Sequence, residues 1–534
     1  MSAALIFVVA LAVRALVAAS IAFPTPEDTA YYFGVARNLV GGRGLVSDAL
    51  WSYQTPPLIF PRPAFEVWLP LPTLLAAMPM AVLGTTFSVA QLPSILIGAV
   101  VPVLSWRLAA DVAAERGLLI GRARVFAIGV GLTSAVYLPL ILHSALPDST
   151  MPFAFLALGA CLLMSRIARD PRGLRRGDFR VVGLGALIGL AALTRNEALW
   201  LGLAWAIVAW GIPGVGKLAR GRAVAIAGLV AFAIFAPWML RDWLAFGSPL
   251  PGQAASNALS VTGFDIFAWN DPPTVGRYLA VGPARLLAMR AEGIWHNLFS
   301  VLLVPGLPLS AIGLVALRWQ ARGAALRPVV LVSAITFLVT SLVFPVATTW
   351  GTFLHAAGPA HVLLIIAALL SLDAALARAG VYRGWTRPVA WLGPTLGVSG
   401  SILFSVIFLP AYGGMARETE AQFLEVARRM AAVGVPLDQR AGPVISNFPI
   451  WLAETAHIPV LALPNEPPSD VLDLARTFDA RLLVLVHAEA GKWPAILSTG
   501  VPGAECFQPL DLGPGPPGSV DPLADIDVFR IACP

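Results

Sequence analysis

Long apolar stretches separated by short polar segments occupy the first 411 residues of the chain. A membrane-spanning helix needs about 20 mostly apolar residues. The stretches that meet this requirement are 4–23, 88–110, 125–142, 150–167, 223–240, 296–317, 328–347, 351–376 and 389–411. The stretch 181–213 is also apolar, but Arg195-Asn196-Glu197 interrupts it, which predicts two short helices joined by a polar turn. The pattern therefore predicts about eleven spans.

A further apolar stretch, 66–84, carries Pro70, Pro72 and Pro79, and whether it crosses the membrane decides the side of everything after it. Short cytoplasmic loops collect Lys and Arg. If 66–84 does not cross, the following clusters all fall on the cytoplasmic side: Arg116, Arg122 and Arg124; Arg169, Arg172, Arg175, Arg176 and Arg180; Lys217, Arg220 and Arg222; Arg318, Arg322 and Arg327; Arg378, Arg383 and Arg387. We therefore predict that 66–84 lies in the outer interface, with a cytoplasmic N-terminus and the C-terminal residues outside.

The residues after 413 follow a different pattern. Ala416–Val433 has the spacing of an amphipathic helix, and beyond it short β-rich runs alternate with helical stretches such as Ser469–Phe478. The β-rich runs are Pro443–Ser446, Ile458–Leu463 and Arg481–His487. This alternation predicts a small α/β domain with a mostly parallel sheet. The predicted division is a transmembrane domain at 1–413, whose first outer loop at 24–87 carries interfacial helices, and an extracytoplasmic α/β domain at 414–534.

Composition and charge sharpen this picture. With 57% hydrophobic and 12% charged residues, the chain is neither a disordered protein nor an ordinary soluble enzyme. The net charge of +6 could indicate nucleic acid, but the Lys and Arg residues lie in short clusters between apolar segments rather than in a stripe interleaved with aromatics. Residues 415–534 carry 8 Lys or Arg against 15 Asp or Glu, and the preceding residues carry 28 against 15. The basic charge is therefore an orientation signal, and no nucleic-acid partner is predicted.

The three cysteines fall in two environments. Cys506 and Cys533 both lie in the predicted outer domain, where the compartment permits a disulfide, but two cysteines alone leave their pairing open. Cys161 lies within a predicted span, and we expect it to serve packing.

The first outer loop holds the densest set of candidate residues. Glu27 and Asp28 follow the first span directly, ahead of an amphipathic helix at Thr29–Leu39 and a Gly-rich turn. One interpretation is that the two acids cap the helix N-terminus, where the helix dipole favours negative charge. The other is functional, because ionisable groups at the membrane edge are costly and are candidates for chemistry.

The order of residues in this loop resembles the first outer loop of the GT-C glycosyltransferases, closest to the protein-mannosyltransferase-like and aminoarabinose-transferase-like group. The matching residues are Asp28, Tyr32, Ala36, Arg37, Leu39, Gly42 and Gly44, followed by Pro56-Pro57-Leu58 ahead of the interfacial element. The resemblance covers residues 1–411 as architecture, with specific matches in a few short stretches. The sequence departs from the protein mannosyltransferases, which have Asp then Glu, because here Glu27 precedes Asp28.

The resemblance implies a polyprenyl-phosphate sugar as donor and Asp28 as the catalytic base, with Glu27 as a lesser candidate. A sugar on a lipid phosphate already has a good leaving group. The reaction therefore needs a base for the acceptor hydroxyl and positive charge for the departing phosphate. One direct displacement at the anomeric carbon inverts its configuration.

Other polar residues of the outer loops supply further candidates. Asp148 either assists acceptor binding or caps the helix that begins at Thr150, and Arg195 and Glu197 either pair or orient the donor. His355 either contacts the donor or forms a helix–helix hydrogen bond. Because the planar fork of Arg suits phosphate oxygens, the candidates for binding the donor and its phosphate are Tyr32, Arg37, Arg62, Arg195, Arg241 and His355. The sequence has no His/Cys cluster with zinc spacing, so no metal ligands are predicted, and the cofactor is left open.

The sequence thus predicts a multi-pass enzyme of the plasma membrane: an inverting glycosyltransferase that moves a sugar from a polyprenyl-phosphate donor to a lipid, glycan or protein acceptor at the outer face. The alternative is a transporter or lipid flippase, which should show paired repeats and broken helices at mid-bilayer. The candidate acids instead cluster at one face of the membrane, which favours catalysis at an interface. A third hypothesis is an inactive scaffold with an outer binding domain.

Overall fold

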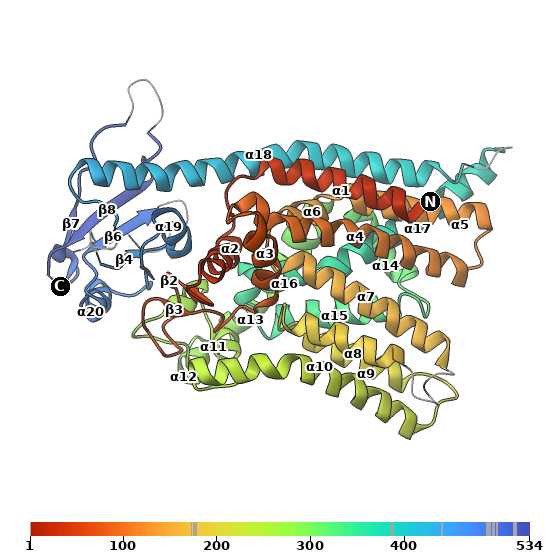
Figure 1. The fold of residues 1–534 in the computed structure, drawn as a ribbon. Coiled ribbons are helices and arrows are strands. Elements are labelled where there is room, and N and C mark those ends of the chain that lie inside the picture. Colours follow the sequence, from red (N-terminus) through yellow and green to blue (C-terminus); the bar gives the residue numbers. More distant parts are fainter. Residues whose placement is uncertain are drawn as a thin grey trace.

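The computed structural model describes residues 2–171, 174, 179–251, 253–385, 389–438, 442–486, 493, 497, 500–515 and 521–533. Several residues used in the predictions above lie outside these ranges: Arg172, Arg175, Arg176, Arg387 and His487. The described chain forms a helical bundle with a small α/β domain at one end (Figure 1). We call this end of the bundle the domain end and the other the opposite end.

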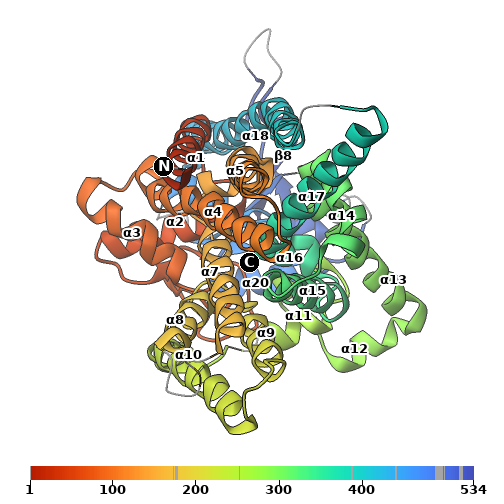
Figure 2. The ribbon, with the colours of Figure 1, turned by 90° about the vertical axis from the view of Figure 1, so that its right-hand side faces the viewer.

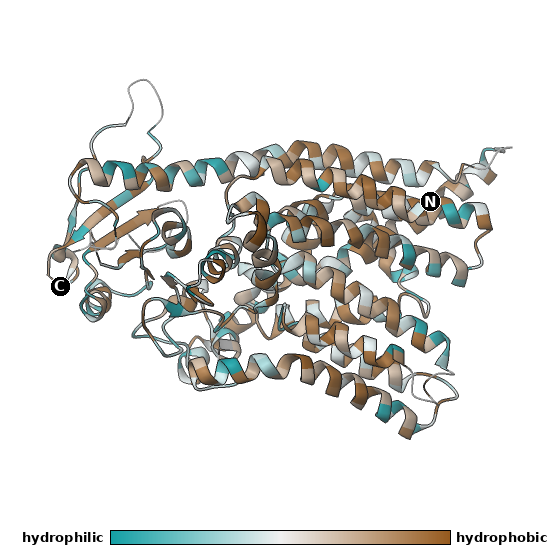
Figure 3. Cartoon of the chain, in the orientation of Figure 1, coloured by the Kyte–Doolittle hydropathy of each residue, from teal (hydrophilic) through white to brown (hydrophobic). Residues whose placement is uncertain are grey.

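Six described helices are long and apolar enough to cross a membrane, and hydrophobic residues predominate along them (Figure 3). They are α1 (Ser2–Ser20), α4 (Phe87–Glu115), α7 (Thr150–Arg169), α10 (Lys217–Phe246), α17 (Gly358–Tyr382) and α18 (Leu392–Ala432). Two bent pairs raise the number to eight if each is one span: α5 (Ile120–Val136) with Leu138–Ala145, and Gly282–Gly306 with α14 (Leu309–Gln320). The shorter apolar helices α8 (Phe179–Ala192), α9 (Ala198–Trp210) and α15 (Arg327–Leu342) coincide with the remaining predicted spans. The predicted polytopic helical domain with a small α/β domain is confirmed.

Shorter elements lie between these helices or within the α/β domain, and Figure 2 shows several of them from the opposite end. They are α2 (Glu27–Val40), α3 (Leu71–Leu83), α6 (Leu138–Leu142), η1 (His143–Ala145), α11 (Gln253–Leu259), η3 (Gly263–Phe267), α12 (Val275–Ala280), α13 (Gly282–Trp295), η4 (His296–Leu303), η5 (Val304–Gly306), η6 (Ala347–Trp350), α16 (Thr352–Ala356) and η8 (Ala504–Cys506), with β1 (Val46–Ser47) pairing antiparallel to β3 (Arg62–Pro63).

Besides 125–142, which bends by 59° after α5, two further predicted spans are not single helices. The stretch 296–317 is interrupted, because the chain bends by 119° between Gly282–Gly306 and α14. Pro305 and Pro308 account for the break, since proline lacks the backbone N–H that a continuing helix requires. The stretch 351–376 is divided at Ala357, which separates α16 from α17. This second break leaves His355 on a short helix of its own.

Helix α3, the apolar part of 66–84, does not carry the chain across the bundle. Gln91, near the start of α4, donates a hydrogen bond to the carbonyl of Ile21, just beyond the end of α1 (3.2 Å). The chain therefore leaves and re-enters the bundle at the domain end. At the opposite end, Arg116, which follows α4 directly, donates a hydrogen bond to Gln320 of α14 (2.5 Å).

The described residues of the α/β domain form a six-stranded sheet in the order β2-β5-β4-β6-β8-β7. Its strands are β2 (Ala49–Leu50), β4 (Val444–Ser446), β5 (Val460–Ala462), β6 (Leu482–Val486), β7 (Phe507–Pro509) and β8 (Ile526–Ile531), and its helices are α19 (Pro449–Ala456) and α20 (Pro468–Phe478). The first four strands in this order are parallel, as the three predicted runs required. The antiparallel pairs β6–β8 and β8–β7 were not predicted.

Strand β2 and helix α18 are among the elements that join this domain to the membrane part. Strand β2 comes from the first outer loop and pairs with β5 through Ala49 opposite Val460. Helix α18 is continuous from Leu392 to Ala432, so the predicted boundary at 413/414 falls inside one helix. Hydropathy changes there, but helical hydrogen bonds between backbone groups do not depend on side-chain polarity. The first outer loop and the C-terminal residues therefore share one sheet.

Cys506 and Cys533 form a disulfide, which closes a 27-residue separation. A loop of this size stabilises a fold by about 3 kcal/mol in the chain-entropy description. We expect the double variant Cys506→Ser/Cys533→Ser to unfold at a lower temperature than the wild type, measured by thermal denaturation of the full chain in detergent. Cys161→Ala, which changes the buried free cysteine, serves as control. A melting temperature that dithiothreitol lowers equally in the wild type and the double variant would contradict the assignment.

Candidate active site

Asp28, in the first turn of α2, lies opposite His355 of α16 at the domain end. Asp28 Oδ2 is 3.4 Å from His355 Nε2. The His355 side chain is buried, whereas 26% of the Asp28 side chain is exposed. The free amides of the first helical turn favour a negative charge at this position. Asp28 therefore has one side against a buried imidazole and another open to an incoming molecule.

A second carboxylate lies behind His355. Thr150 Oγ1 is 2.7 Å from His355 Nδ1, and Asp148 Oδ2 is 3.9 Å from the same nitrogen and 3.4 Å from His143 Nδ1. Asp148 also accepts a hydrogen bond from the Thr150 amide (2.8 Å). Burial by itself raises the pKa of the Asp148 carboxyl, but His143, His355 and the Thr150 amide together outweigh it, so this pKa lies below its ordinary value. Asp148 thus satisfies the first amide of α7 and also remains ionised beside the histidines.

Arg195 joins three segments around this cluster. It forms a bidentate ion pair with Glu197 (2.9 and 3.0 Å), as one of the two interpretations of the sequence expected. Its Nη1 donates to Ser149 Oγ (2.8 Å) and its Nη2 to the carbonyl of Thr352 (3.3 Å). The positive charge is therefore held in a fixed plane between α7, the 195–197 turn and α16.

Tyr32 lies one helical turn after Asp28 and is fully buried. Burial raises the pKa of its hydroxyl above the ordinary value, although the positive charge of Arg195 and a hydrogen bond with Ser149 act in the opposite direction. The hydroxyl is thus a neutral hydrogen-bonding group next to Asp28 and Arg195.

Arg62 is held inside the first loop by partners of that loop. Its side chain is fully buried, and its three nitrogens donate to Glu66 Oε1 (3.2 Å), the Pro57 carbonyl (3.0 Å) and the Thr55 carbonyl (2.8 Å). That Arg62 binds the donor phosphate stays a prediction. Sequence spacing could not decide the matter, because the interactions depend on how the proline-rich segment folds back.

Three other predicted site residues also bind elsewhere. Arg37 pairs with Glu454 of α19 (2.5 Å). Arg241 pairs with Asp242 (3.0 Å) and stacks over a tryptophan ring. Glu27 accepts hydrogen bonds from two backbone amides at the start of α19. These contacts occupy Arg37, Arg241 and Glu27 away from the Asp28–His355 contact, although Glu27 also lines a pocket beside the α/β domain. Their roles in catalysis or donor binding stay predictions.

No family model matches this sequence, and no curated protein does. Among solved structures, ArnT from Cupriavidus metallidurans bound to undecaprenyl phosphate is similar at a TM-score of 0.58 and 13% identity, over 99% of this chain and 97% of that one. The apo state of the same protein is similar at a TM-score of 0.55 and 13% identity, over 99% of this chain and 98% of that one. A third similar structure is the archaeal oligosaccharyltransferase AglB from Archaeoglobus fulgidus in complex with an inhibitory peptide and a dolichol-phosphate. Its TM-score is 0.56 and its identity 14%, over 94% of this chain and 72% of that one. Both proteins are GT-C glycosyltransferases.

The chain has the GT-C fold. In this fold the described residues His143, Asp148 and His355 form a buried group whose ligand atoms all lie within 4.8 Å of one another. Two imidazoles and a carboxylate suit Zn²⁺ and similar divalent metals. A divalent ion held by them would supply positive charge on the Nδ1 side of His355, across the ring from Asp28.

Sequence reasoning missed this group. It predicted no metal ligands and did not select His143 as a candidate, because the group combines two segments that are far apart in the chain and lacks the spacing of a local motif. The signal that was available is a histidine five residues before an acid in a short outer loop, His143 and Asp148.

Metal binding by this group can be tested without a substrate. We expect Zn²⁺ added to metal-stripped protein to raise the melting temperature, since a ligand at 100 times its Kd stabilises the native state by about 2.7 kcal/mol. His143→Ala should abolish the rise because it removes one donor. His457→Asn should retain it, because His457 is an exposed histidine of the α/β domain whose left-handed backbone (φ 56°) asparagine tolerates. The same rise in wild type and His143→Ala would contradict this donor set.

Proposed function

We propose that this chain is an inverting glycosyltransferase that moves a sugar from a polyprenyl-phosphate carrier to an acceptor at the outer face of the cell membrane. The observation that carries the proposal is the contact between the partly exposed Asp28 carboxylate and the buried His355 imidazole. The GT-C fold supports it, since ArnT and AglB share this fold and their structures contain undecaprenyl phosphate and dolichol-phosphate. The domain end is assigned to the outside, because basic residues such as Arg116 and Arg122 lie at the opposite end.

In the proposed reaction Asp28 accepts the proton of the acceptor hydroxyl. The acceptor oxygen then bonds to the anomeric carbon while the bond from that carbon to the phosphate oxygen breaks. The carrier leaves as polyprenyl phosphate, and the configuration of the sugar inverts. His355, held at Nδ1 by Thr150, keeps the Asp28 carboxylate oriented.

The departing phosphate requires positive charge close to Asp28. Arg195 is the candidate, because its side chain is 11% exposed and is held rigidly by Glu197 and Ser149. A charge that is fixed before reaction stabilises a developing anion without reorganisation. The neutral hydroxyl of Tyr32 adds a hydrogen-bonding group on the same side.

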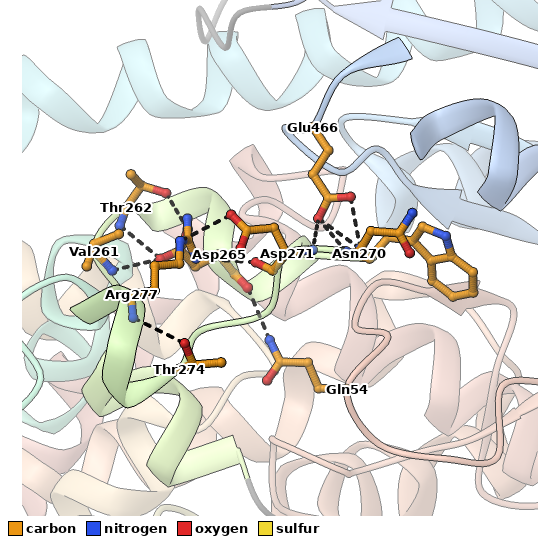
Figure 4. A network of polar contacts seen from close by, with 10 residues as sticks. Gln54, Val261, Thr262, Asp265, Asn270, Asp271, Thr274, Arg277 and Glu466 are labelled. Atoms are coloured by element: carbon orange, nitrogen blue, oxygen red, sulfur yellow. Dashed lines mark hydrogen bonds and ion pairs between the residues drawn. The ribbon is translucent and has the colours of Figure 1, made fainter. Parts of the chain in front are cut away.

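Two buried acids fold the long outer loop that follows α10 (Figure 4). Asp265 accepts hydrogen bonds from two amides of its own turn and pairs with Arg277 (2.9 Å). Glu466, from the α/β domain, accepts hydrogen bonds from the three backbone amides of 269–271 at 2.8–3.0 Å. These two carboxylates hold the loop backbone in place, so that the aromatic side chains of the loop pack against the α/β domain.

A small pocket, which we call the cavity, lies between this loop and the α/β domain. Its aromatic lining residues are Phe264, Phe267, Trp350, Phe448 and Trp493. Asn447 and Leu463, which follow β4 and β5, also line it, so the cavity lies at the carboxyl ends of parallel strands, where open sheets bind ligands. Trp350 is followed by Gly351, which lies directly against His355: a Cβ added at Gly351 would be 3.1 Å from His355 Nε2. The proposed acceptor enters here and reaches Asp28.

Trp350→Ala tests this entry route. We expect it to raise the KM for the acceptor about fivefold, since an aromatic contact with a ligand is worth on the order of 1 kcal/mol, and to leave the binding of the polyprenyl-phosphate donor unchanged. Trp319→Ala is a matched control, because Trp319 and Trp350 are each 50% exposed and Trp319 lies at the opposite end. An unchanged acceptor KM in Trp350→Ala would redirect the acceptor to another surface.

The proposed function is tested by incubating the full chain, in lipid nanodiscs, with radiolabelled polyprenyl-phosphate sugars. Transfer or release of the labelled sugar from its carrier is the expected result. A transporter or flippase would instead move an intact lipid across vesicle membranes without cleaving it. Vesicle flipping with no cleavage of any donor would overturn the proposal.

A further inference from the structure

Helix α2 presents two sets of residues on different faces. An α-helix turns about 100° per residue, so Glu27, Gly34 and Arg37 lie along one face, while Asp28 and Tyr32 lie on another. The first face packs against α19 of the α/β domain, and the second faces the candidate active site. A contact on the first face therefore sets the position of residues on the second.

Glu27 binds the beginning of α19. Its Oε1 accepts hydrogen bonds from the amides of Ile450 (2.9 Å) and Trp451 (3.3 Å). These first-turn amides lack partners within their own helix, and the helix dipole favours an anion at this point. The residue that precedes α19, Phe448, supplies no side-chain cap, so Glu27 takes that role from another element. The Trp451 indole also donates to the Pro24 carbonyl (3.0 Å), just ahead of α2.

Arg37 binds the end of α19. Its Nη1 is 2.5 Å from Glu454 Oε1, and the two side chains are 24% and 8% exposed. An ion pair shielded in this way is more costly to break than one at the surface. Gly34 lies between the two contacts, where a Cβ would be 3.0 Å from Glu454 Oε2. The absence of a side chain at Gly34 allows the two helices to approach closely.

We propose that α19 clamps α2 at both ends and thereby sets the position of Asp28 relative to His355. In this proposal Glu27, Arg37 and Glu454 are positioning residues, and it rests on the proposed function in taking Asp28 as the base.

Helix α2 also contacts the bundle side, where Thr73 of α3 donates to the Tyr32 carbonyl (3.0 Å) and Phe33 packs on Phe87. The clamp adds the attachment of α2 to the α/β domain, and the 3.4 Å contact between Asp28 and His355 depends on both attachments. A displacement of about 1 Å at a reacting group can cost roughly 10²-fold in rate.

Two variants of Glu27 separate positioning from catalysis. Glu27→Gln keeps an oxygen that can accept the α19 amides, and we expect its kcat to stay within about threefold of wild type. Glu27→Ala removes that acceptor, and its kcat should fall by about 10²-fold with the donor KM changed less than about threefold. If Glu27 itself were a base, Glu27→Gln would be as inactive as Glu27→Ala, and that result would overturn the positioning role.

The other end of the clamp is tested by a double-mutant cycle. We expect Arg37→Ala and Glu454→Ala each to lower kcat about tenfold or more, and the double variant to lose no more than the worse single variant, because both remove the same contact. Arg481→Ala is the matched control, since Arg481 forms an exposed ion pair with Asp479 in the same domain, and it should behave as wild type. Losses that multiply in the double variant would show that the two residues act independently.

Hydrogen exchange tests, without any sugar donor, whether the contacts with α19 hold α2 in place. In the full chain, the backbone amide hydrogens of 27–40 should exchange with solvent at least about tenfold faster in Glu27→Ala and Arg37→Ala than in the wild type. In Asp28→Asn and Arg481→Ala their exchange should stay at the wild-type rate. If exchange is faster but no donor is cleaved by the wild type, the proposed function fails and the clamp stands. If Asp28→Asn is inactive while Glu27→Ala and Arg37→Ala keep full activity and protection, the clamp fails and the function stands.

Discussion

Asp28→Asn is expected to lower the rate of sugar transfer by about 10²–10⁴-fold, the usual contribution of a general base. The asparagine has the same shape and keeps an oxygen facing His355 Nε2, which lies 3.4 Å from the carboxylate in the wild type. What it loses is the ability to accept the proton of the acceptor hydroxyl. Single-turnover transfer of a radiolabelled sugar measures this loss, and thermal denaturation should show an unchanged melting temperature.

A matched control for this variant is Asp271→Asn. Asp271 lies in the long outer loop, and 67% of its side chain is exposed. The same chemical change there should leave transfer at the wild-type rate. Turnover of Asp28→Asn at the wild-type rate would remove the main support for the catalytic assignment.

Arg195→Met should combine the largest loss of stability with a large loss of transfer. It leaves Glu197, a buried carboxylate, without its bidentate partner, and breaking a buried ion pair costs about 3–5 kcal/mol. Arg195→Met/Glu197→Met removes both charges, which is often close to neutral for stability, so we expect the melting temperature to recover. Transfer should stay about 10²–10³-fold below wild type in the double variant, because a fixed charge beside the departing phosphate is missing.

The control for that pair is an ion pair remote from the site. Arg122 of α5 binds Asp373 of α17 at the opposite end (2.6 Å). Arg122→Met/Asp373→Met makes the same chemical change and should retain wild-type transfer. Transfer restored to Arg195→Met/Glu197→Met together with its melting temperature would limit Arg195 to a structural role.

Local patterns predicted most of the fold. Runs of about 20 apolar residues placed the helices, and the interruption at Arg195-Asn196-Glu197 correctly divided 181–213 into α8 and α9. The same approach failed at 296–317, where Pro305 and Pro308 bend the chain by 119°. Mean apolarity measures whether a segment prefers lipid, whereas backbone hydrogen bonding decides whether it remains one helix.

The sequence by itself determined that the protein is a multi-pass membrane protein with a small α/β domain, and it located Asp28 and Tyr32, which share one face of one helix. Only the tertiary structure brought Asp28 and Asp148 to His355, and only it bound Glu27 to the start of α19. The physical reason is that hydropathy and helical spacing act between neighbours in the chain. The partner of a buried charge is instead chosen by the elements that pack around it, and these come from distant parts of the sequence.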